Sequence, residues 1–235
     1  MRTLILLRHG ESVWNAADRF AGWADVPLSD VGREEAAGAG VLLAKAGLLP
    51  DVVHTSLLRR AISTADIALD AAERHWIPVR RTWRLNERHY GALQGRLREE
   101  VRTRFGDERF MAWRRSYDVA PPPAEQGAVV AGDRNARYRH LGVTIPATES
   151  LKDVLARLLP YWESAICADL HVGRTVLLVA HGNVLRALIS HLEQIPSDAI
   201  RQITVPTGKP IRCELTDGLR LKFVAARDCQ HRPLR

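Results

Sequence analysis

The chain has 235 residues, of which 46% are hydrophobic, and its formal net charge is +7. This length and apolar content suit one α/β domain with a sizeable core, so we expect a single catalytic domain over residues 1–235. Charged residues interrupt every apolar run before the roughly 18 residues of a membrane span, and the first strand begins too near Met1 to leave room for a signal peptide. These features predict a cytoplasmic protein with no membrane partner.

The positive charge raises the question of a nucleic-acid partner, because Lys and Arg gain affinity for nucleic acids by neutralising phosphates. The arginines are scattered and form neither a basic tail nor a patch interleaved with aromatic residues. A positive field draws in a small polyanion equally well, so we expect a small-molecule ligand and no nucleic acid. Cys167, Cys213 and Cys229 show no paired spacing and no His/Cys cluster suited to zinc, which predicts reduced thiols and no metal site.

The first predicted strand is the apolar run of residues 4–7, which ends abruptly on Arg8, His9 and Gly10. A continuous apolar run is typical of a buried parallel strand, and in open α/β sheets the ligand site lies outside the carboxyl ends of the strands. His9 is therefore a candidate reactive imidazole. The competing interpretation is a core histidine that happens to follow a strand, which is the commoner case for a lone histidine.

Helix signals surround the next predicted strand. Ser29 can cap a helix that continues to Ala46 and stops at Gly47. Residues 51–56 read as a short strand, and residues 57–69 read as a helix with Arg59 and Arg60 beside its start. Helix N-termini attract phosphate through free amides and the macrodipole, and an arginine in the first turn adds bidentate charge. This segment therefore predicts an anion site.

Helical periodicity disappears between residues 117 and 148, so this segment reads as a long insertion, better suited to a lid over the site than to a separate domain. Beyond it we expect a helix over residues 151–166, interrupted near Pro160. The apolar stripe of that helix consists of Leu151, Val154, Leu155 and Leu158. The alternation of helix signals with short apolar strands predicts an α/β fold, a doubly wound and mostly parallel sheet in three layers.

A later predicted strand repeats the arrangement of the first. The run of residues 174–180 leads into His181, Gly182 and Asn183. In a parallel sheet both strand ends lie on one edge, so His9 and His181 are expected to converge although they are far apart in sequence. Two convergent imidazoles divide naturally into one nucleophile and one charge stabiliser. This pairing favours the reactive interpretation of His9 over the core interpretation.

Four motifs occur in order along the chain. They are Arg8-His9-Gly10-Glu11-Ser12-x-Trp14-Asn15, Thr55-Ser56-x-x-x-Arg60-Ala61, Leu85-Asn86-Glu87-Arg88-His89-Tyr90-Gly91 and His181-Gly182-Asn183. On these motifs the chain resembles the cofactor-dependent phosphoglycerate mutases of the histidine phosphatase superfamily. The first motif alone indicates only the superfamily, whereas the segment 85–95 is much more specific to the mutases. The similarity extends from residue 3 to about residue 222.

The resemblance implies a division of catalytic roles. His9 is the expected nucleophile, whose neutral imidazole takes up a phosphoryl group as phosphohistidine. Arg8, Arg60 and a protonated His181 are expected to stabilise phosphoryl charge in place of a metal ion, so the pKa values of the two histidines should be pushed apart. Glu87 is the expected general acid/base, which removes and returns the proton of the substrate hydroxyl.

The resemblance also implies a set of substrate-binding residues. These are Ser12, Asn15, Ala21, Gly22, Tyr90, Arg98, Arg114, Arg115, Gly182 and Asn183. Adjacent arginines on a helix are more often a solvated face, so the assignment of Arg114 and Arg115 depends mainly on the resemblance. Glu11 is expected to brace the turn after His9 rather than to react. Without its flanking motif, Glu87 reads equally well as a surface ion pair with Arg84 or Arg88.

The chain departs from the family pattern at several positions. Ala21 stands where threonine is usual, which removes a hydroxyl near the substrate carboxylate; Arg98 replaces the usual lysine and Val184 the usual serine. The chain also ends soon after Phe223, where related mutases continue with a tail that helps to close the site. A less closed site admits more water to the phosphohistidine.

The resulting expectation is an enzyme that interconverts 3-phosphoglycerate and 2-phosphoglycerate in glycolysis and gluconeogenesis. 2,3-Bisphosphoglycerate is the expected phosphoryl primer, with no metal, and a homo-oligomer, either a dimer or a tetramer, is expected from the resemblance. One alternative is a histidine-type phosphatase that acts on a small phosphoester, in which water is the second acceptor. A non-enzymatic binding protein is the other alternative, and it would neither acquire a phosphoryl group on His9 nor turn over any phosphoester.

Overall fold

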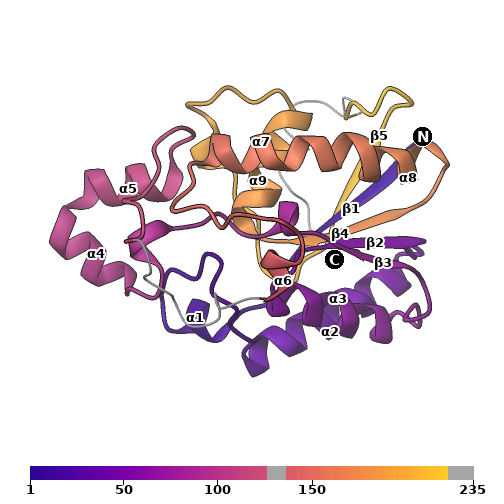
Figure 1. Cartoon of the computed structure of the whole chain (residues 1–235). Coiled ribbons are helices and arrows are strands. Elements are labelled where there is room, and N and C mark those ends of the chain that lie inside the picture. Colours follow the sequence, from indigo (N-terminus) through magenta and orange to yellow (C-terminus); the bar gives the residue numbers. More distant parts are fainter. Residues whose placement is uncertain (126–135, 222–235) are drawn as a thin grey trace.

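The computed structural model of the chain describes residues 1–125 and 136–221. Its centre is a five-stranded sheet with the order β3-β2-β4-β1-β5 (Figure 1). The first four of these strands are mutually parallel, and β5 runs antiparallel to β1 at one edge. The strands are β1 (Arg2–Arg8), β2 (Val52–Thr55), β3 (Val79–Arg81), β4 (Val176–Ala180) and β5 (Ile211–Leu215). The predicted α/β class with a mostly parallel sheet is confirmed.

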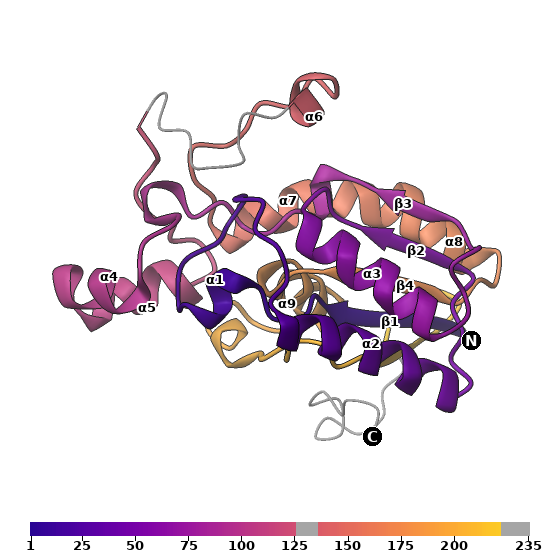
Figure 2. The ribbon, with the colours of Figure 1, turned by 90° about the horizontal axis from the view of Figure 1, so that it is seen from below.

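Helices cover both faces of the sheet, which gives the predicted three layers (Figure 1). On one face lie α2 (Asp30–Lys45) and α3 (Arg59–Ala71), which occupy the foreground of Figure 2. On the other face lie α7 (Leu151–Tyr161), α8 (Cys167–His171) and α9 (Gly182–Leu192). The remaining short elements are α1 (Val13–Ala16), η1 (Trp83–Leu85), η2 (Gly91–Leu93), α4 (Arg98–Phe105), α5 (Asp107–Arg115), α6 (Ala136–Arg139), η3 (Trp162–Ile166) and η4 (Ile200–Gln202).

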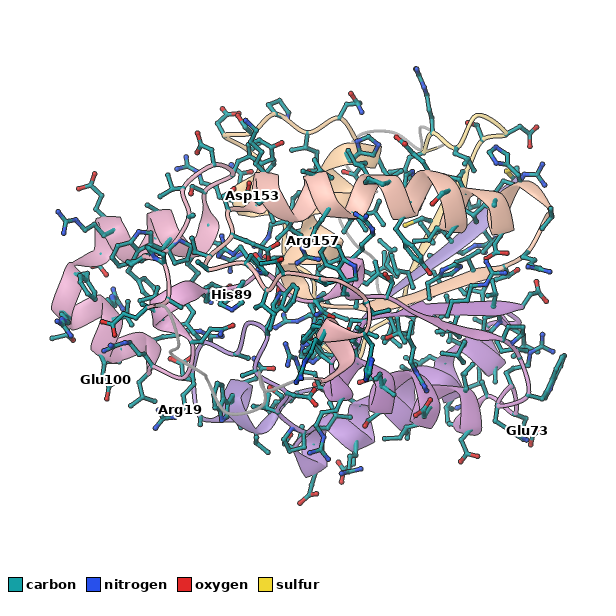
Figure 3. The ribbon with its side chains drawn as sticks, in the orientation of Figure 1. Arg19, Glu73, His89, Glu100, Asp153 and Arg157 are labelled. Atoms are coloured by element: carbon teal, nitrogen blue, oxygen red, sulfur yellow. The ribbon has the colours of Figure 1, made fainter. Side chains whose placement is uncertain are left out.

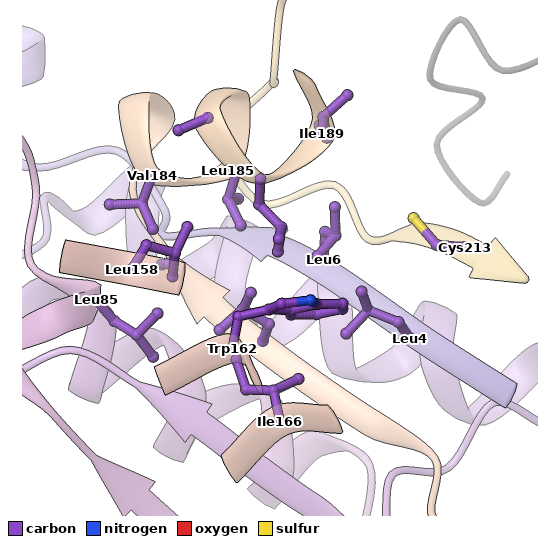
Figure 4. Packing of buried hydrophobic residues seen from close by; sticks show 14 of the residues in the cluster. Leu4, Leu6, Leu85, Leu158, Trp162, Ile166, Val184, Leu185, Ile189 and Cys213 are labelled. Carbon is purple, nitrogen blue, oxygen red and sulfur yellow. The ribbon is translucent and has the colours of Figure 1, made fainter. Parts of the chain in front are cut away.

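Strand β1 contributes side chains to two separate hydrophobic clusters, because successive side chains of a strand point to opposite faces of the sheet. Leu4 and Leu6 belong to the cluster beneath α7 and α9, which Figure 4 shows closing around Trp162. Ile5 and Leu7 belong to the cluster beneath α2 and α3. All four side chains are fully buried. Burial on both faces explains why the run of residues 4–7 is apolar without alternation.

The predicted helix boundaries follow local chemistry. Ser29 caps α2, and its hydroxyl accepts a hydrogen bond from the amide of Gly32 at 3.1 Å. The helix ends with Ala46 as its C-cap, and Gly47 follows with a φ of +63°, as predicted. The helix expected over residues 151–166, interrupted near Pro160, changes geometry close to that residue. There α7 passes into the π-helical turn η3, since proline supplies no amide for the regular ladder.

The segment of residues 117–148 is described only in part, since residues 126–135 lie outside the described residues. Its two arms are joined by a hydrogen bond from the amide of Ala124 to the carbonyl of Ala147 at 2.9 Å. The second arm contains α6, from which Tyr138 is buried against Trp23 with ring centroids 5.0 Å apart. The described arms therefore pack on the domain, and the lid remains a prediction.

Two composition-based predictions can be compared with the described residues. Within residues 1–125 and 136–221, no helix is long and apolar enough to cross a membrane. Cys167 and Cys213 are buried and form no disulfide within the described residues, and Cys229 lies outside them. Burial raises the pKa of the Cys167 thiol to about 11. That thiol therefore stays protonated at neutral pH.

Candidate active site

The two histidines converge because of strand register. Arg8, the last residue of β1, is paired with Ala180, the last residue of β4. His9 and His181 are the next residues on neighbouring strands, and their ring centroids are 4.9 Å apart. The amide of His9 also donates to the carbonyl of Ala180 at 3.0 Å. The predicted convergence of the two imidazoles is confirmed.

His9 is held as a neutral imidazole with one free nitrogen. Its Nδ1 lies 2.6 Å from the carbonyl oxygen of Gly10, so Nδ1–H donates and Nε2 keeps its lone pair. Burial, followed by the positive charges of Arg60 and Arg8, lowers the pKa of His9 well below its ordinary value. The turn depends on glycine, because a Cβ on Gly10 would lie 2.1 Å from the carbonyl oxygen of Gly32. These features suit a nucleophile.

His181 differs from the expectation that it is protonated. Burial, followed by the charges of Arg60 and neighbouring groups, lowers its pKa well below the ordinary value, so both pKa values fall instead of moving apart. The cause is that arginines surround both imidazoles and disfavour a further cation. The Oγ of Ser56 lies 2.8 Å from Nε2 of His181 and accepts a hydrogen bond from the amide of Leu58. The Ser56 proton can therefore go to Nε2, which places the imidazole proton on Nδ1.

Three buried N–H donors beside His9 have no hydrogen-bond partner among the described residues. They are Nε of Arg8, Nε of Arg60 and Nδ1 of His181. Each such donor costs about 1–3 kcal/mol when nothing accepts from it. The oxygens of a phosphoryl group are acceptors that can satisfy all three donors. The three donors therefore make this cluster a candidate oxyanion site.

The two arginines of this oxyanion site are anchored through their other nitrogens. Nη1 of Arg8 donates to the carbonyl of Val205 at 2.9 Å. Nη1 and Nη2 of Arg60 donate to the carbonyls of Ala24 and Gly22, each at 2.8 Å. Burial lowers the pKa of Arg60 to about 10, so it stays charged at neutral pH. The anchored arginines supply fixed positive charge without reorganisation.

Glu87 lies on the loop between η1 and η2 and is 9% exposed. Its Oε1 accepts hydrogen bonds from its neighbour's amide, that of Arg88, at 2.7 Å and from Nδ2 of Asn183 at 3.0 Å. Nδ2 of Asn183 also lies 2.9 Å from the hydroxyl of Tyr90. The loop thus places a carboxylate next to the helix that starts after His181.

A cavity with about 610 Å³ of empty space, its mouth included, joins these groups. Six arginines and a single carboxylate line it, so an anionic ligand is strongly favoured there. The predicted site residues among its lining are Arg8, His9, Asn15, Ala21, Gly22, Arg60, Glu87, Tyr90, Arg98, Arg114, Arg115, Gly182 and Asn183. Among the described residues, no group of three or more His, Cys, Asp or Glu side chains gathers as a metal site would require.

The sequence model described as the histidine phosphatase superfamily (branch 1) matches residues 4–137 and 131–223. The chain belongs to this superfamily. A relative from Nocardia farcinica is 59% identical over 93% of this chain and 88% of its own length, and it is named 2,3-bisphosphoglycerate-dependent phosphoglycerate mutase. A relative from Rhodococcus jostii with the same name is also 59% identical, over 93% of this chain and 86% of its own length.

Solved structures of the histidine phosphatase fold are similar as well. A mycobacterial glucosyl-3-phosphoglycerate phosphatase in complex with VO3 aligns with a TM-score of 0.73 and 28% identity, over 94% of this chain and 96% of that chain. Bacillus stearothermophilus YhfR aligns with a TM-score of 0.70 and 28% identity, over 95% of this chain and 96% of that chain. The fold is therefore that of this superfamily.

Two predicted site residues of this superfamily member do not line the cavity. His181 is fully buried beside His9. Ser12 is fully buried too, because it caps α1: its Oγ lies 2.8 Å from Oδ1 of Asn15 and accepts from the Asn15 amide at 3.2 Å. The structure thus does not bring the Ser12 side chain to the substrate space. Glu11 accepts a hydrogen bond from Oγ of Ser29 at 2.7 Å, which braces the turn as expected.

The far end of the cavity holds the arginines that the resemblance assigned to substrate. Arg98 pairs with Asp18 at 2.5 Å and lies beside the ring of Phe20. Arg114 and Arg115 stand in the last turn of α5, and both line the cavity. The adjacent arginines are therefore not only a solvated face, although each remains partly exposed.

Sequence reasoning missed two arginines of the site. Arg186 lines the cavity, and its Nη1 donates to Oδ1 of Asn183 at 2.8 Å. Its position three residues after Asn183 puts both on one helix face, which was the available signal. Arg88 is fully buried, stacks on Tyr90 and donates to the carbonyls of Trp113 and Arg114. It holds the end of α5, a role that nothing in its sequence context indicates.

Proposed function

We propose that the chain interconverts 3-phosphoglycerate and 2-phosphoglycerate through a phosphohistidine at His9, as a step of glycolysis and gluconeogenesis. The observation that carries the proposal is the cavity. Arg8 and Arg60, which hold two of the unpartnered donors beside His9, line it together with Arg98, Arg114, Arg115 and Arg186. A three-carbon acid with two anionic ends fits such a space. The name shared by the relatives at 59% identity supports the same activity.

The first step is phosphoryl uptake by His9. Nε2 attacks phosphorus, so a nitrogen–phosphorus bond forms while the phosphorus–oxygen ester bond breaks. Nε of Arg8, Nε of Arg60 and Nδ1–H of His181 donate to the phosphoryl oxygens as charge shifts towards the leaving group. Glu87 gives its proton to the leaving oxygen, which departs as a hydroxyl.

In the second step the free hydroxyl of a bound monophosphoglycerate attacks the phosphohistidine, which forms 2,3-bisphosphoglycerate; once this bisphosphate has reoriented, its other phosphoryl group returns to His9 by the first step and the isomeric monophosphoglycerate is released. Glu87, now ionised, takes the proton of the free hydroxyl as its oxygen attacks phosphorus, and Nε2 of His9 leaves. Asn183 holds Oε1 of Glu87 throughout, at 3.0 Å. The exchange conserves the phosphoryl group and one proton, and water must stay out while His9 is phosphorylated.

The arginines at the far end bind and orient the substrate. Arg98, Arg114, Arg115 and Arg186 supply charge for its carboxylate or second phosphate, and the Gly22 amide and Asn15 add neutral donors. 2,3-Bisphosphoglycerate, when bound, supplies the phosphoryl group that primes His9. In this proposal fixed arginines carry the charge stabilisation, and no metal ion takes part in any step.

A phosphatase acting on a small phosphoester is the second candidate. The similar solved structures include phosphatases, and Ala21 supplies no hydroxyl to the cavity. A coupled assay with 3-phosphoglycerate and trace 2,3-bisphosphoglycerate decides between the two: isomer formation unaffected by chelators supports the mutase, and steady release of inorganic phosphate without isomer supports the phosphatase. The homo-oligomer, the cytoplasmic location and the absence of a nucleic-acid partner stay predictions.

A further inference from the structure

Arg157 is a buried cation outside the cavity. It lies on α7, is 8% exposed and does not line the space that holds His9. Figure 3 shows it beneath α7, on the side that faces His89. Burial of a guanidinium costs free energy unless its N–H groups are hydrogen-bonded. The acceptors that Arg157 binds therefore indicate its structural role.

The guanidinium of Arg157 is tied to the loop that carries Glu87. Nη1 donates to the carbonyl of Arg84 at 2.7 Å, and Nη2 donates to the carbonyls of Asn86 and Glu87 at 2.8 and 3.0 Å. Arg84 belongs to η1, and Asn86 and Glu87 follow it on the loop to η2, where no regular strand or helix supplies donors to their carbonyls. The Arg157 side chain therefore satisfies backbone carbonyls that a helix or strand would otherwise satisfy.

Glu149 completes the frame from the other side. Its carboxylate accepts from Nε of Arg157 at 2.6 Å and from Nη2 at 3.1 Å. Oε2 of Glu149 also accepts from the amide of His89 at 2.8 Å, and the Glu149 amide donates to the His89 carbonyl at 2.9 Å. The pair thus grips the backbone on both sides of Glu87.

We propose that Arg157 is a positioning residue, which acts through the backbone of residues 84–89 to hold the Glu87 carboxyl where it exchanges a proton with the substrate oxygen. The inference rests on the proposed function, because it assigns that proton transfer to Glu87. Proton transfer demands a close, aligned approach, and a displacement of about 1 Å costs up to about a hundredfold in rate. Asn183 and the Arg88 amide bind Oε1, but the Asn183 contact does not fix the main chain of the loop.

The experiment compares two phosphoryl donors with different leaving groups. 2,3-Bisphosphoglycerate releases an alkoxide that needs a proton, whereas p-nitrophenyl phosphate releases a phenolate that does not. Rapid-quench measurement of His9 phosphorylation gives the rate for each donor. Arg157→Met is expected to slow phosphorylation by 2,3-bisphosphoglycerate about tenfold or more and to change the p-nitrophenyl phosphate rate less than about threefold. Equal losses with both donors would overturn the inference.

A second arm guards against a merely structural effect. Arg157→Lys keeps a positive charge beside Glu149 but cannot reach all the loop carbonyls. This variant should fold, and it should still lose more phosphorylation rate with 2,3-bisphosphoglycerate than with p-nitrophenyl phosphate. In a Glu87→Gln background, the Arg157 substitution should add no further loss, because the two residues act in series. Additive losses contradict the proposal. Arg74→Lys is the matched control, since Arg74 clamps the Pro50 carbonyl before β2 and should leave both rates unchanged.

Failure of the proposed function gives a different result. A wild-type protein that forms no isomer but releases phosphate from 3-phosphoglycerate is a phosphatase. The donor comparison then uses 3-phosphoglycerate in place of 2,3-bisphosphoglycerate, with the same expected donor dependence for Arg157→Met. If Arg157→Met then slows phosphorylation equally with both donors, the proposed role of Arg157 is wrong.

Discussion

Asn183 Nδ2 donates to Oε1 of Glu87 at 3.0 Å, which links the first turn of α9 to the loop after η1. Because α9 begins directly after His181, one short helix segment organises both halves of the proposed site: the proposed oxyanion site at His181 and the proposed acid/base at Glu87. Oδ1 of Asn183 accepts from Arg186, so the amide orientation is fixed at both ends.

Replacement of Asn183 should therefore impair chemistry more than binding. We expect Asn183→Ala to lower kcat about tenfold or more, with a smaller change in KM, because Glu87 loses a neutral donor that fixes its geometry. Ser190→Ala is the control, as Ser190 is a buried α9 residue whose hydroxyl donates to the Ala187 carbonyl within the same helix. A large rise in KM at unchanged kcat would instead place Asn183 among the substrate contacts alone.

Two glycines of α2 offer a matched pair. A Cβ on Gly32 would lie 1.9 Å from the carbonyl oxygen of Glu11, in the turn after His9, whereas a Cβ on Gly38 meets nothing within 4 Å. Gly32→Ala should reduce the free energy of unfolding by about 1–3 kcal/mol and lower kcat through displacement of the turn. Gly38→Ala should stabilise by about 0.5–1 kcal/mol at unchanged kcat. Urea unfolding and steady-state kinetics measure both, and equal effects would refute the close packing at Gly32.

Acid should destabilise the protein between pH 6.5 and about pH 4. Burial lowers the pKa of His54 to about 4, in spite of its hydrogen bond to Asp169 at 2.9 Å. In this window the unfolded chain binds a proton that the folded chain does not, so the free energy of unfolding falls as the pH falls. The contribution of His54 is on the order of 3 kcal/mol across the window.

His54→Gln should flatten that pH dependence, whereas substitution of the exposed His75 should not change it. Urea unfolding at a series of pH values measures the slope. An identical slope in the His54 variant would show that this residue does not remain neutral in the folded protein.

Ala21 lines the cavity at the position where the mutase pattern has threonine. We expect Ala21→Thr to lower KM for 3-phosphoglycerate several-fold, since the added hydroxyl gives the substrate carboxylate one further donor worth about 1 kcal/mol. Ala21→Val is the matched control, because it adds the same bulk without the donor. If both variants change KM alike, the effect comes from volume and not from hydrogen bonding.

The sequence was sufficient to predict what depends on local pattern. The uninterrupted apolar run before His9 indicated a strand buried on both faces, and Ser29 and Gly47 marked the limits of α2. The convergence of His9 and His181 followed from the parallel strands, because the ends of neighbouring parallel strands lie together.

What depends on long-range packing was beyond such reasoning. Nothing near Arg157 in sequence indicates that it binds carbonyls about seventy positions away, from Arg84 to Glu87. The pKa of His181 was mispredicted for the same reason: its burial and the arginines around it arise only when separate segments meet. Ser12 was assigned to substrate because its motif matches, whereas capping of α1 uses its hydroxyl.

The most direct test of the account is a labelling and chase experiment at His9. Protein incubated with labelled 2,3-bisphosphoglycerate is digested and the acid-labile phosphoryl group is located by mass spectrometry, and unlabelled 3-phosphoglycerate is then added to the labelled enzyme. The account predicts label on His9 alone, its transfer to organic phosphoglycerates, and no labelling of His9→Ala. Isomerisation by an enzyme that carries no phosphoryl group on His9, or by His9→Ala, would contradict it.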